Sequence, residues 1–356
     1  MSAVRVKFGD IVRKVNDKVD PSVDDIERFV AGEHMDTDEQ KIFRFGNVGE
    51  GYLGPAFHMR FKPGHILYGS RRTYLRKVAM ADFEGVCSNT TFVIAPSDDR
   101  LDASYLLNVM STERFHQNSI SLSKGSTNPY INFSDLAAYE FELPSIEEQQ
   151  RIVELLSGVD AHAEALRNQL HVANETRKSV LHHLLTAGGD DWTETTLGNV
   201  IQLSYGKALK AEDRDGDGFP VFGSAGEVGQ HSEPNVPFVP VVIVGRKGTA
   251  GAVWWSDIPC SVIDTAYFLV LKAEGNPKYF YHLLESLDLP TLTAQTGVPG
   301  LNRDRVHSCE FLCPPLIEQQ RIVDEVSKID AVIQETTSAL AATRQLRSAL
   351  LNKEIS

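Results

Sequence analysis

The chain contains 356 residues, and because a domain holds ~150 residues on average, we expect two or three structural units. Hydrophobic residues make up 42% and charged residues 23% of the sequence, which excludes a disordered or collagen-like chain, and the formal net charge is -13. Four cysteines without a CxxC pair argue against a disulfide framework and against structural zinc. No run approaches the ~20 apolar residues that cross a bilayer, and no signal peptide opens the chain, so we expect a cytoplasmic protein without membrane contact.

A basic segment lies early in this acidic chain. Residues 40–80 carry eight Lys or Arg side chains against Glu50 alone, a net charge of +7. Such a segment favours nucleic-acid binding, and an acidic protein partner is the alternative. Within it, the loop GSRRTYLRK at 69–77 follows the apolar run HILYG. We expect its Arg and Lys side chains to reach guanine edges or phosphates, with Tyr74 stacking or donating a hydrogen bond; a solvated hairpin tip is the other interpretation.

The rest of residues 1–143 is rich in glycine, proline and β-forming residues, which predicts a mixed α and β body. The run TTFVIA at 90–95 predicts a strand, and a short helix is expected over 103–111. The loop KGSTNPYIN at 124–132 offers polar side chains and backbone N–H groups that could donate hydrogen bonds to DNA. Its Asn132 is better explained as the cap of a turn.

A long helix is predicted from about residue 147 to residue 185. Pro144 and two glutamates mark its start, where carboxylates offset the helix dipole, and AGGDD marks its end. Positions that alternate in steps of three and four, from Leu156 to Leu184, form a heptad seam. At ~1.5 Å per residue the helix would be ~60 Å long, which exceeds a small domain.

Residues 188–313 predict a second mixed body. Strands are expected at 239–245 and 266–272, and a helix at 277–286. The loop VIVGRKGTAG at 242–251 carries Arg246 and Lys247 after a strand that ends in glycine, and TGVPGLNRDR at 296–305 corresponds to the loop at 124–132. With 9 basic and 16 acidic residues, this body has a net charge of -7, so any DNA-binding face must be local.

The chain contains one unit twice. PSIEEQQRIVELLSGVDA at 144–161 aligns with PPLIEQQRIVDEVSKIDA at 314–331 at a constant offset of 170, without a gap. KFGDIV at 7–12 and TLGNVI at 196–201 are a weaker pair at an offset of 189, so the bodies differ in length while the connectors do not. The second connector keeps the heptad register from Ile322 to Glu354, which predicts that the two helices pair antiparallel. Each polar Arg177 or Arg347 in the seam could set register or meet an outside partner; an exposed helix end is the simpler explanation.

Catalytic motifs are absent from the sequence. DRDGDG at 213–218 begins like a calcium loop, but Ser224 occupies the position of the required glutamate. NPY at 128–130 lacks the second proline and the upstream glycine-rich loop of an amino-group DNA methyltransferase. There is no GxxxxGK[ST], HExxH or GxSxG, and we expect the His182-His183 pair to lie on the surface. The sequence indicates recognition without catalysis.

The duplicated connector resembles the specificity subunit of type I restriction-modification systems, and the resemblance covers nearly the whole chain. It implies an α+β fold with two mixed α/β target-recognition domains, joined by two long antiparallel coiled-coil helices in a pseudo-twofold internal repeat. The expected boundaries are 1–143 for the first recognition domain, 144–187 for the central helix, 188–313 for the second recognition domain and 314–356 for the C-terminal helix.

The resemblance also implies a non-catalytic reader of double-stranded DNA with a bipartite asymmetric target. Two methyltransferase subunits would dock on the helices, and restriction subunits would join through them. The chain would hold no cofactor; S-adenosylmethionine, ATP and Mg would belong to those partners. The expected DNA-binding residues are Arg44, Lys62, Ser70, Arg71, Arg72, Tyr74, Arg76, Lys77, Lys124, Lys207, Lys210, Arg246, Lys247, Arg303 and Arg305. The expected partner-binding residues are Gln149, Gln150, Arg151, Gln319, Gln320 and Arg321.

Two other hypotheses remain open. A stand-alone enzyme would need a hidden site and would methylate or cleave DNA as an isolated chain. A coiled-coil adaptor of another defence assembly would explain the helices without DNA contact, but it would leave the +7 segment and the duplicated bodies unexplained.

Overall fold

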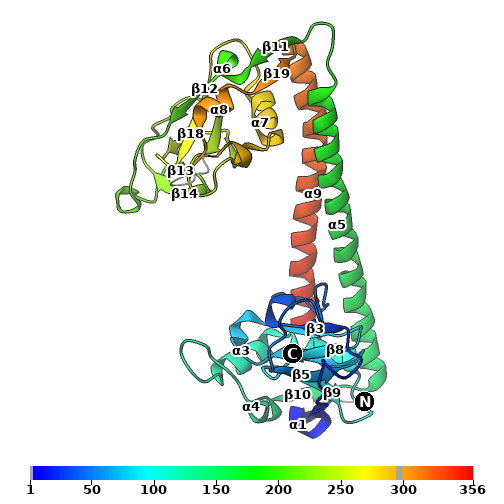
Figure 1. Ribbon diagram of the computed structural model, residues 1–356. Coiled ribbons are helices and arrows are strands. Elements are labelled where there is room, and N and C mark those ends of the chain that lie inside the picture. Colours follow the sequence, from blue (N-terminus) through cyan, green and yellow to red (C-terminus); the bar gives the residue numbers. More distant parts are fainter. Residues whose placement is uncertain (1–2, 294–299, 356) are drawn as a thin grey trace. The chain divides into compact units, whose positions relative to one another are not determined.

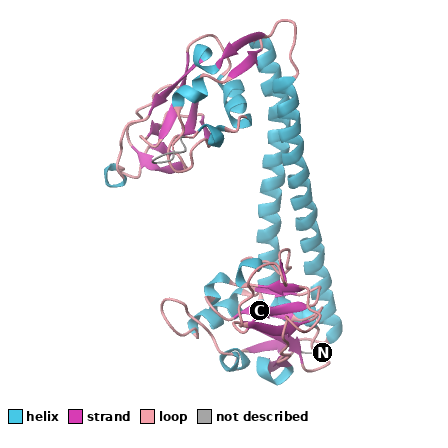
Figure 2. Cartoon of the chain, in the orientation of Figure 1, coloured by secondary structure: helices cyan, strands magenta, loops and turns pink. Residues whose placement is uncertain are grey.

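The computed structural model describes residues 3–293 and 300–355, and the chain forms two compact units. Unit 1 comprises residues 1–167 and 339–356, and unit 2 comprises residues 168–338. Each unit contains a mixed α and β body and a part of both long helices, α5 (Ile146–Thr186) and α9 (Leu316–Glu354) (Figure 1 and Figure 2). The two mixed bodies and the two long helices confirm the predicted fold class. The units divide both helices between them, whereas the sequence boundaries set each helix apart from the bodies.

The body of unit 1 contains one two-stranded ladder and two four-stranded sheets. The ladder pairs β1 (Val4–Lys7) with β10 (Glu140–Leu143). The strand order of the first sheet is β2 (Val12–Lys14), β9 (Thr91–Pro96), β6 (Ile66–Gly69), β7 (Val78–Met80). The strand order of the second sheet is β4 (Gly46–Asn47), β3 (Arg28–Val30), β8 (Gly85–Ser88), β5 (Phe57–Phe61). The helices are α1 (Phe8–Ile11), α2 (Ala103–Met110), α3 (Glu113–Ser121) and α4 (Phe133–Ala137), with 3-10 turns η1 (Gly32–His34) and η2 (Thr73–Leu75).

The body of unit 2 follows the same plan. Its ladder pairs β11 (Thr193–Thr196) with β19 (Glu310–Cys313). The strand order of its first sheet is β12 (Ile201–Tyr205), β18 (Ala266–Leu271), β15 (Val241–Gly245), β16 (Val253–Ser256). The strand order of its second sheet is β14 (Gly226–His231), β13 (Phe219–Gly223), β17 (Ser261–Val262). The helices are α6 (Leu197–Val200), α7 (Pro277–Ser286) and α8 (Arg303–His307), with 3-10 turns η3 (Ala211–Asp213) and η4 (Leu289–Leu292).

Strand pairing reveals the repeat in the bodies, where the sequence shows little of it. In the second sheet of unit 1, β3 pairs parallel with β8 and antiparallel with β4. In unit 2, β13 pairs in the same way with β17 and β14.

The predicted strands and short helices are confirmed as β9, β15, β18, α2 and α7.

A close helix contact explains the glycine that both bodies share near their start. The short helix α1 packs against α4, and α6 packs against α8. A Cβ on Gly9 would lie 2.7 Å from the Cβ of Ala137, and a Cβ on Gly198 would lie 2.9 Å from the Cβ of His307. Only glycine leaves room for these contacts, which accounts for the match of KFGDIV with TLGNVI.

Each body shares its core with the beginning of one long helix. The large core of unit 1 includes Phe8, Tyr105 and Phe115 together with Ile152 and Leu156 of α5. The large core of unit 2 includes Leu197, Tyr267, Tyr279 and Phe280 together with Ile322 and Val323 of α9. Removing this apolar surface from water fixes the first turns of each helix to the body that precedes it.

The long helices pair antiparallel within each unit. In unit 1 the first part of α5 lies against the last part of α9, where Ala163 and Leu166 pack on Leu340. The heptad positions predicted from Leu156 to Leu184 and from Ile322 to Glu354 are all buried or half-buried, which confirms the seam. The described helices include none with the length and apolar composition of a membrane span.

Candidate nucleic-acid interface

The two loops predicted to meet DNA in the first body lie against each other in unit 1. The backbone N–H of Ile131 donates to the carbonyl oxygen of Ser70 at 3.0 Å, and the N–H of Arg72 donates to that of Pro129 at 2.6 Å. Lys124 and Tyr130 exchange two backbone hydrogen bonds of 2.8 and 2.9 Å, which close the second loop into a hairpin. Segments 69–77 and 124–132 therefore form one surface.

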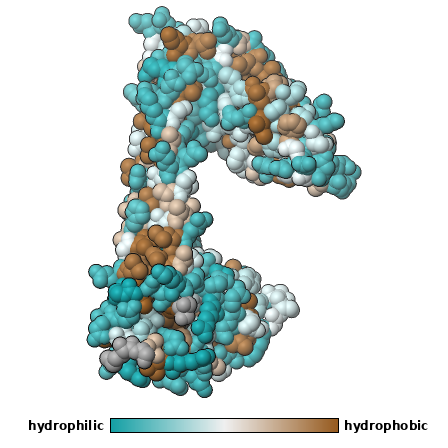
Figure 3. Space-filling view, turned by 180° about the vertical axis from the view of Figure 1, so that it is seen from behind, coloured by the Kyte–Doolittle hydropathy of each residue, from teal (hydrophilic) through white to brown (hydrophobic). Residues whose placement is uncertain are grey.

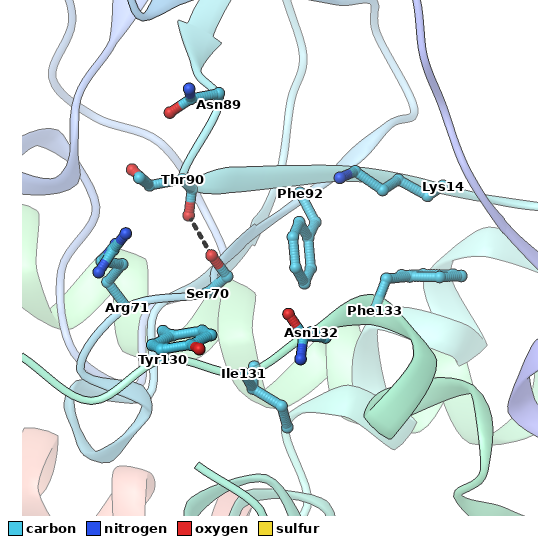
Figure 4. Close-up of a pocket in the computed structure, with 10 residues that line it drawn as sticks. All are labelled: Lys14, Ser70, Arg71, Asn89, Thr90, Phe92, Tyr130, Ile131, Asn132 and Phe133. Atoms are coloured by element: carbon cyan, nitrogen blue, oxygen red, sulfur yellow. Dashed lines mark hydrogen bonds between the residues drawn. The ribbon is translucent and has the colours of Figure 1, made fainter. Parts of the chain in front are cut away.

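A hollow of about 370 Å³ opens beside this surface. Its lining residues are Lys14, Ser70, Arg71, Asn89, Thr90, Phe92, Tyr130, Ile131, Asn132 and Phe133 (Figure 4). The Arg71 guanidinium lies 5.4 Å from the centre of the Tyr130 ring, and the Lys14 ammonium lies 4.5 Å from that of Phe92. Aromatic faces attract cations, so both positive groups have a defined place at the rim of the hollow.

In unit 2 the corresponding loops meet through an equivalent backbone bond. The N–H of Leu301 donates to the carbonyl oxygen of Arg246 at 2.8 Å, and Lys247 bridges to Gly300. Leu301 follows Ile131 by the repeat offset of 170 residues. Arg246 and Lys247 thus occupy the places of Ser70 and Arg71. Part of the predicted loop, residues 296–299, lies outside the described residues.

The ring of Tyr205, at the end of β12, contacts two arginine side chains of unit 2. The guanidinium of Arg246 lies 4.9 Å and that of Arg303 lies 5.1 Å from the centre of its ring, which is half-exposed. Arg246 also donates to the carbonyl oxygen of Asp264 at 3.0 Å. Burial raises the pKa of the neighbouring Tyr267, and the positive charge of Arg246 opposes that shift. The result is a small positive site in an acidic body.

Carboxylates neutralise half of the basic segment at 40–80. Four of its eight cations form ion pairs with residues outside the segment: Lys41 with Glu164, Arg44 with Asp36, Arg60 with Glu84 and Arg76 with Glu113. Arg71 and Arg72 are exposed and make no ion pair with any described residue. The charge available to DNA is therefore smaller than +7 and is concentrated at the loop 69–77.

The other predicted DNA-binding residues have different surroundings. Ser70 is buried and its hydroxyl donates to the carbonyl oxygen of Thr90 at 2.7 Å, while the Lys77 ammonium donates to the carbonyl oxygen of Gly32. Tyr74 is half-exposed, and Lys62, Lys207 and Arg305 are exposed. Lys124 pairs with Asp135, Lys210 with Glu212 and Arg303 with Asp304. Arg44 and Lys62 lie outside both loops of unit 1.

Sequence reasoning missed Lys14, Asn89, Tyr130 and Tyr205. Lys14 reaches the hollow because β2 pairs with β9, and Asn89 lies in the turn between β8 and β9. Neither position has a signal in the sequence, since both depend on strand pairing. Tyr205 ends the apolar alternation of its strand, and an exposed aromatic residue at a strand end could have marked it.

The predicted partner-binding residues divide into buried and exposed positions. Gln149 and Gln319 are 0% and 2% exposed, and their amides bond to backbone groups of their own units. These two side chains offer no surface to another protein. Gln150, Arg151, Gln320 and Arg321 are exposed, and each arginine bonds to a glutamate three residues earlier, Glu148 or Glu318.

The acidic segment at 213–218 begins at the last residue of η3 and ends directly before β13. Asp215 accepts a hydrogen bond from the backbone N–H of Ser232 at 3.0 Å, and its contact with His231 measures 3.5 Å. The described part of the chain contains no group of three metal-ligating side chains. The arrangement is that of an acidic turn.

Comparison with known proteins identifies a family. Residues 29–173 and 189–342 match the type I restriction modification DNA specificity domain, so the family pattern occurs twice. Over 156 residues the chain is 28% identical to the type I restriction enzyme EcoDI specificity subunit of Escherichia coli, which covers 43% of this chain and 34% of that protein. A putative type I specificity subunit of Mycoplasma pneumoniae is 29% identical over 209 residues, with 54% and 55% covered. The matches thus span about half or less of these relatives.

One solved structure has a similar fold over the whole length. The crystal structure of a type I restriction-modification system S subunit from M. genitalium aligns with 100% of this chain and 96% of its own, at a TM-score of 0.63 and 18% identity. At this identity the likeness concerns the fold alone.

Proposed function

We propose that this chain, which belongs to the family of type I restriction modification DNA specificity domains, selects the target sequence for a type I restriction-modification complex. Each body would read one half of a bipartite asymmetric target in double-stranded DNA. The chain itself would carry out no chemistry and hold no cofactor, while methyltransferase and restriction subunits would bind S-adenosylmethionine, ATP and Mg. This activity would take place in the cytoplasm.

One observation carries the proposal: both bodies join the same two loops and hold arginine side chains beside an aromatic ring there. In unit 1 the joined loops present Arg71 beside Tyr130, and in unit 2 they present Arg246 and Arg303 beside Tyr205. Arginine at a defined place can bond to the two acceptors of guanine, and an exposed aromatic ring adds a stacking surface. The two surfaces share one loop arrangement but carry different side chains, so one chain could bind a target whose two halves differ in sequence.

The helix beginnings offer candidate docking surfaces for methyltransferase subunits. Gln150 and Arg151 near the start of α5 correspond to Gln320 and Arg321 near the start of α9, and all four are exposed. Apolar side chains also reach the surface on the long helices, as the face in Figure 3 illustrates, and Ile317 is 83% exposed. Two similar surfaces would suit two copies of one subunit.

Methylation mapping tests this proposal. The chain would be expressed with its neighbouring methyltransferase in a host without its own modification systems, and each protein would also be expressed alone. We expect a split motif that is modified only when both proteins are present. Replacing residues 1–143 with another body should change one half of the motif, whereas a change in both halves would contradict independent reading.

The adaptor hypothesis predicts a different result. Expression and complex formation without modification in any combination would favour an adaptor of another defence assembly. Methylation or cleavage by the isolated chain would indicate a catalytic site of its own.

A further inference from the structure

A half-buried arginine joins three elements in unit 2. Arg177 lies on α5, and its Nε donates to the carboxylate of Asp330 on α9. Its Nη2 donates to Oε2 of Glu285 at 2.8 Å and lies 3.4 Å from Nδ1 of His282, both in the α7 segment of the body. The Arg177 side chain is 17% exposed and that of His282 is 0% exposed. A single guanidinium therefore links both long helices to the body.

Unit 1 contains the equivalent arrangement. Arg347 lies on α9, and its Nε donates to Oδ1 of Asp160 on α5 at 2.5 Å. Its Nη2 donates to Oδ1 of Asn108 on α2 at 3.2 Å and to Oε1 of Gln40 at 2.5 Å. The side chain of Arg347 is also 17% exposed.

The repeat relates the two arrangements residue by residue. Arg347 follows Arg177 by 170 positions, and Asp330 follows Asp160 by 170 positions, so each arginine pairs with the aspartate of the other repeat. The body partners also correspond, because Asn108 and His282 each lie six residues after the N-cap of their helix, Asp102 or Asn276. The same Arg–Asp pair between the long helices thus occurs in both units, and the arginine contacts different body residues in each unit.

Such an interaction restricts geometry more than an apolar seam does. Apolar contacts are non-directional, so a heptad seam alone tolerates small shifts and rotations of the helices and of the body packed on them. A guanidinium that is largely removed from water must keep its hydrogen-bond partners, and breaking one leaves a charge without compensation. Because the partners of Arg177 come from α9 and from the body, a shift of either element relative to α5 would break at least one of these contacts.

We propose that Arg177 and Arg347 are positioning residues that fix the orientation of each body on the helix pair. One consequence rests on the proposed function: the recognition loops would then reach a fixed place along the DNA, so the spacer between the two half-sites would have one length. Neither arginine would need to contact DNA or another protein.

The orientation can be measured without DNA. Spin labels would be attached through azide-bearing residues introduced at Glu175 on α5 and Glu227 on β14, both exposed positions of unit 2, so that the native cysteines remain. Pulsed electron paramagnetic resonance then gives the distance distribution between helix and body in the full chain. We expect Arg177→Met to widen it about twofold, and Glu285→Gln, which keeps the helix-to-helix pair, to widen it less.

The matched control is Lys328→Met. Lys328 pairs with Glu325 on the same helix at 2.7 Å and is 68% exposed, so its loss should leave the width unchanged. A width in Arg177→Met and Glu285→Gln equal to that of Lys328→Met would overturn the proposal. Circular dichroism shows whether Arg177→Met or Glu285→Gln is unfolded. If one of them is, the width of the distance distribution in the other variant tests the proposal.

The DNA consequence has a separate readout. With the methyltransferase present, the wild-type chain should modify half-sites at one spacing, and Arg177→Met should modify spacings changed by a single base pair about tenfold more often than the wild type does. A wild-type chain that modifies no split target would refute the proposed function but would leave the spin-label result to decide on the positioning residues. A single spacing in both proteins, together with a widened distance distribution, would refute only the consequence for the spacer.

Discussion

The side-chain amide of Gln149 joins the first turn of α5 to the start of α2, because its Oε1 accepts a hydrogen bond from the backbone N–H of Asp102 at 2.9 Å. Its Nε2 donates to the carbonyl oxygens of Arg100 and Pro144 at 2.8 and 2.9 Å. Gln319 repeats this interaction with the N–H of Asn276 at 2.8 Å. The first glutamine of each EQQRIV motif thus attaches a long helix to the preceding body.

Replacing that glutamine should therefore cost stability. Gln149→Leu removes the partners of three backbone groups, and we expect the free energy of unfolding to fall by about 1–3 kcal/mol. Urea denaturation followed by circular dichroism measures the change. Gln150→Leu is the control, since its side chain is exposed, and equal losses in the two variants would contradict the structural role of Gln149.

DNA binding should depend on Arg71 far more than on Arg60. Arg71 is exposed and free of ion pairs with the described residues, whereas Arg60 is held by Glu84. We expect Arg71→Ala to weaken binding of the assembled complex to its target by about 1–3 kcal/mol, or roughly fivefold to 150-fold, and to relax one half-site. Arg60→Ala should bind as the wild type does. Fluorescence anisotropy at fixed salt provides the comparison, and an equal effect of both substitutions would argue for diffuse attraction only.

The second half-site should depend on the ring of Tyr205. Because the guanidinium groups of Arg246 and Arg303 both lie near its face, Tyr205→Ala should remove one of the contacts that position them and reduce target affinity by about 1 kcal/mol. Tyr205→Phe keeps the ring and should retain most of the affinity. If both variants lose affinity equally, the hydroxyl group would be the important feature, and the role assigned to the ring would be wrong.

The two docking surfaces should respond differently to one substitution. Ile317 precedes Gln320 and Arg321 on one face of α9, while the corresponding position on α5 is Glu147. We expect Ile317→Lys, which introduces a charge opposite to that of Glu147, to weaken methyltransferase binding to unit 2 while leaving the site on unit 1 intact, so that one bound copy is lost. Native mass spectrometry counts the copies. Glu147→Gln, which keeps the size of the side chain, should preserve both copies, and an unchanged count in Ile317→Lys would exclude this surface.

Acid should destabilise unit 1 through His116. Burial, with a smaller effect from the positive charge of Arg76, lowers the pKa of His116 to about 4, and its Nδ1 lacks a hydrogen-bond partner among the described residues. The unfolded chain, with a histidine pKa of about 6.5, binds the proton more readily, so stability is lost as the pH falls from about 6.5 towards 4. His116 should account for about 2 kcal/mol of the loss between pH 7 and pH 5.

His116→Gln removes this titration, so its free energy of unfolding should fall less between those two pH values than that of the wild type. The exposed His171 supplies the control, and His171→Gln should keep the wild-type pH dependence. Urea denaturation at pH 7 and pH 5 gives all three values. An identical pH dependence in the wild type and His116→Gln would show that another group is responsible.

The sequence alone established the repeat and the long helices. A constant offset of 170 and an unbroken heptad pattern are local properties of the chain, and they predict α5 to within about a residue and α9 to within two residues at each end. Three strands and two short helices, β9, β15, β18, α2 and α7, followed from local apolar patterns for the same reason. Loops rich in Arg, Lys and Gly could be recognised individually.

Only the tertiary structure decided which of those residues act together. Pairing of β2 with β9 brings Lys14 to Phe92, and the bond from Ile131 to Ser70 joins two loops that are far apart in the chain. Ion pairs formed across the fold neutralise Arg76 and Arg44 but not Arg71, which a count of charges cannot distinguish. The repeated residues Gln149 and Arg177 serve the chain internally, because burial depends on what packs against a side chain and the sequence does not contain that information.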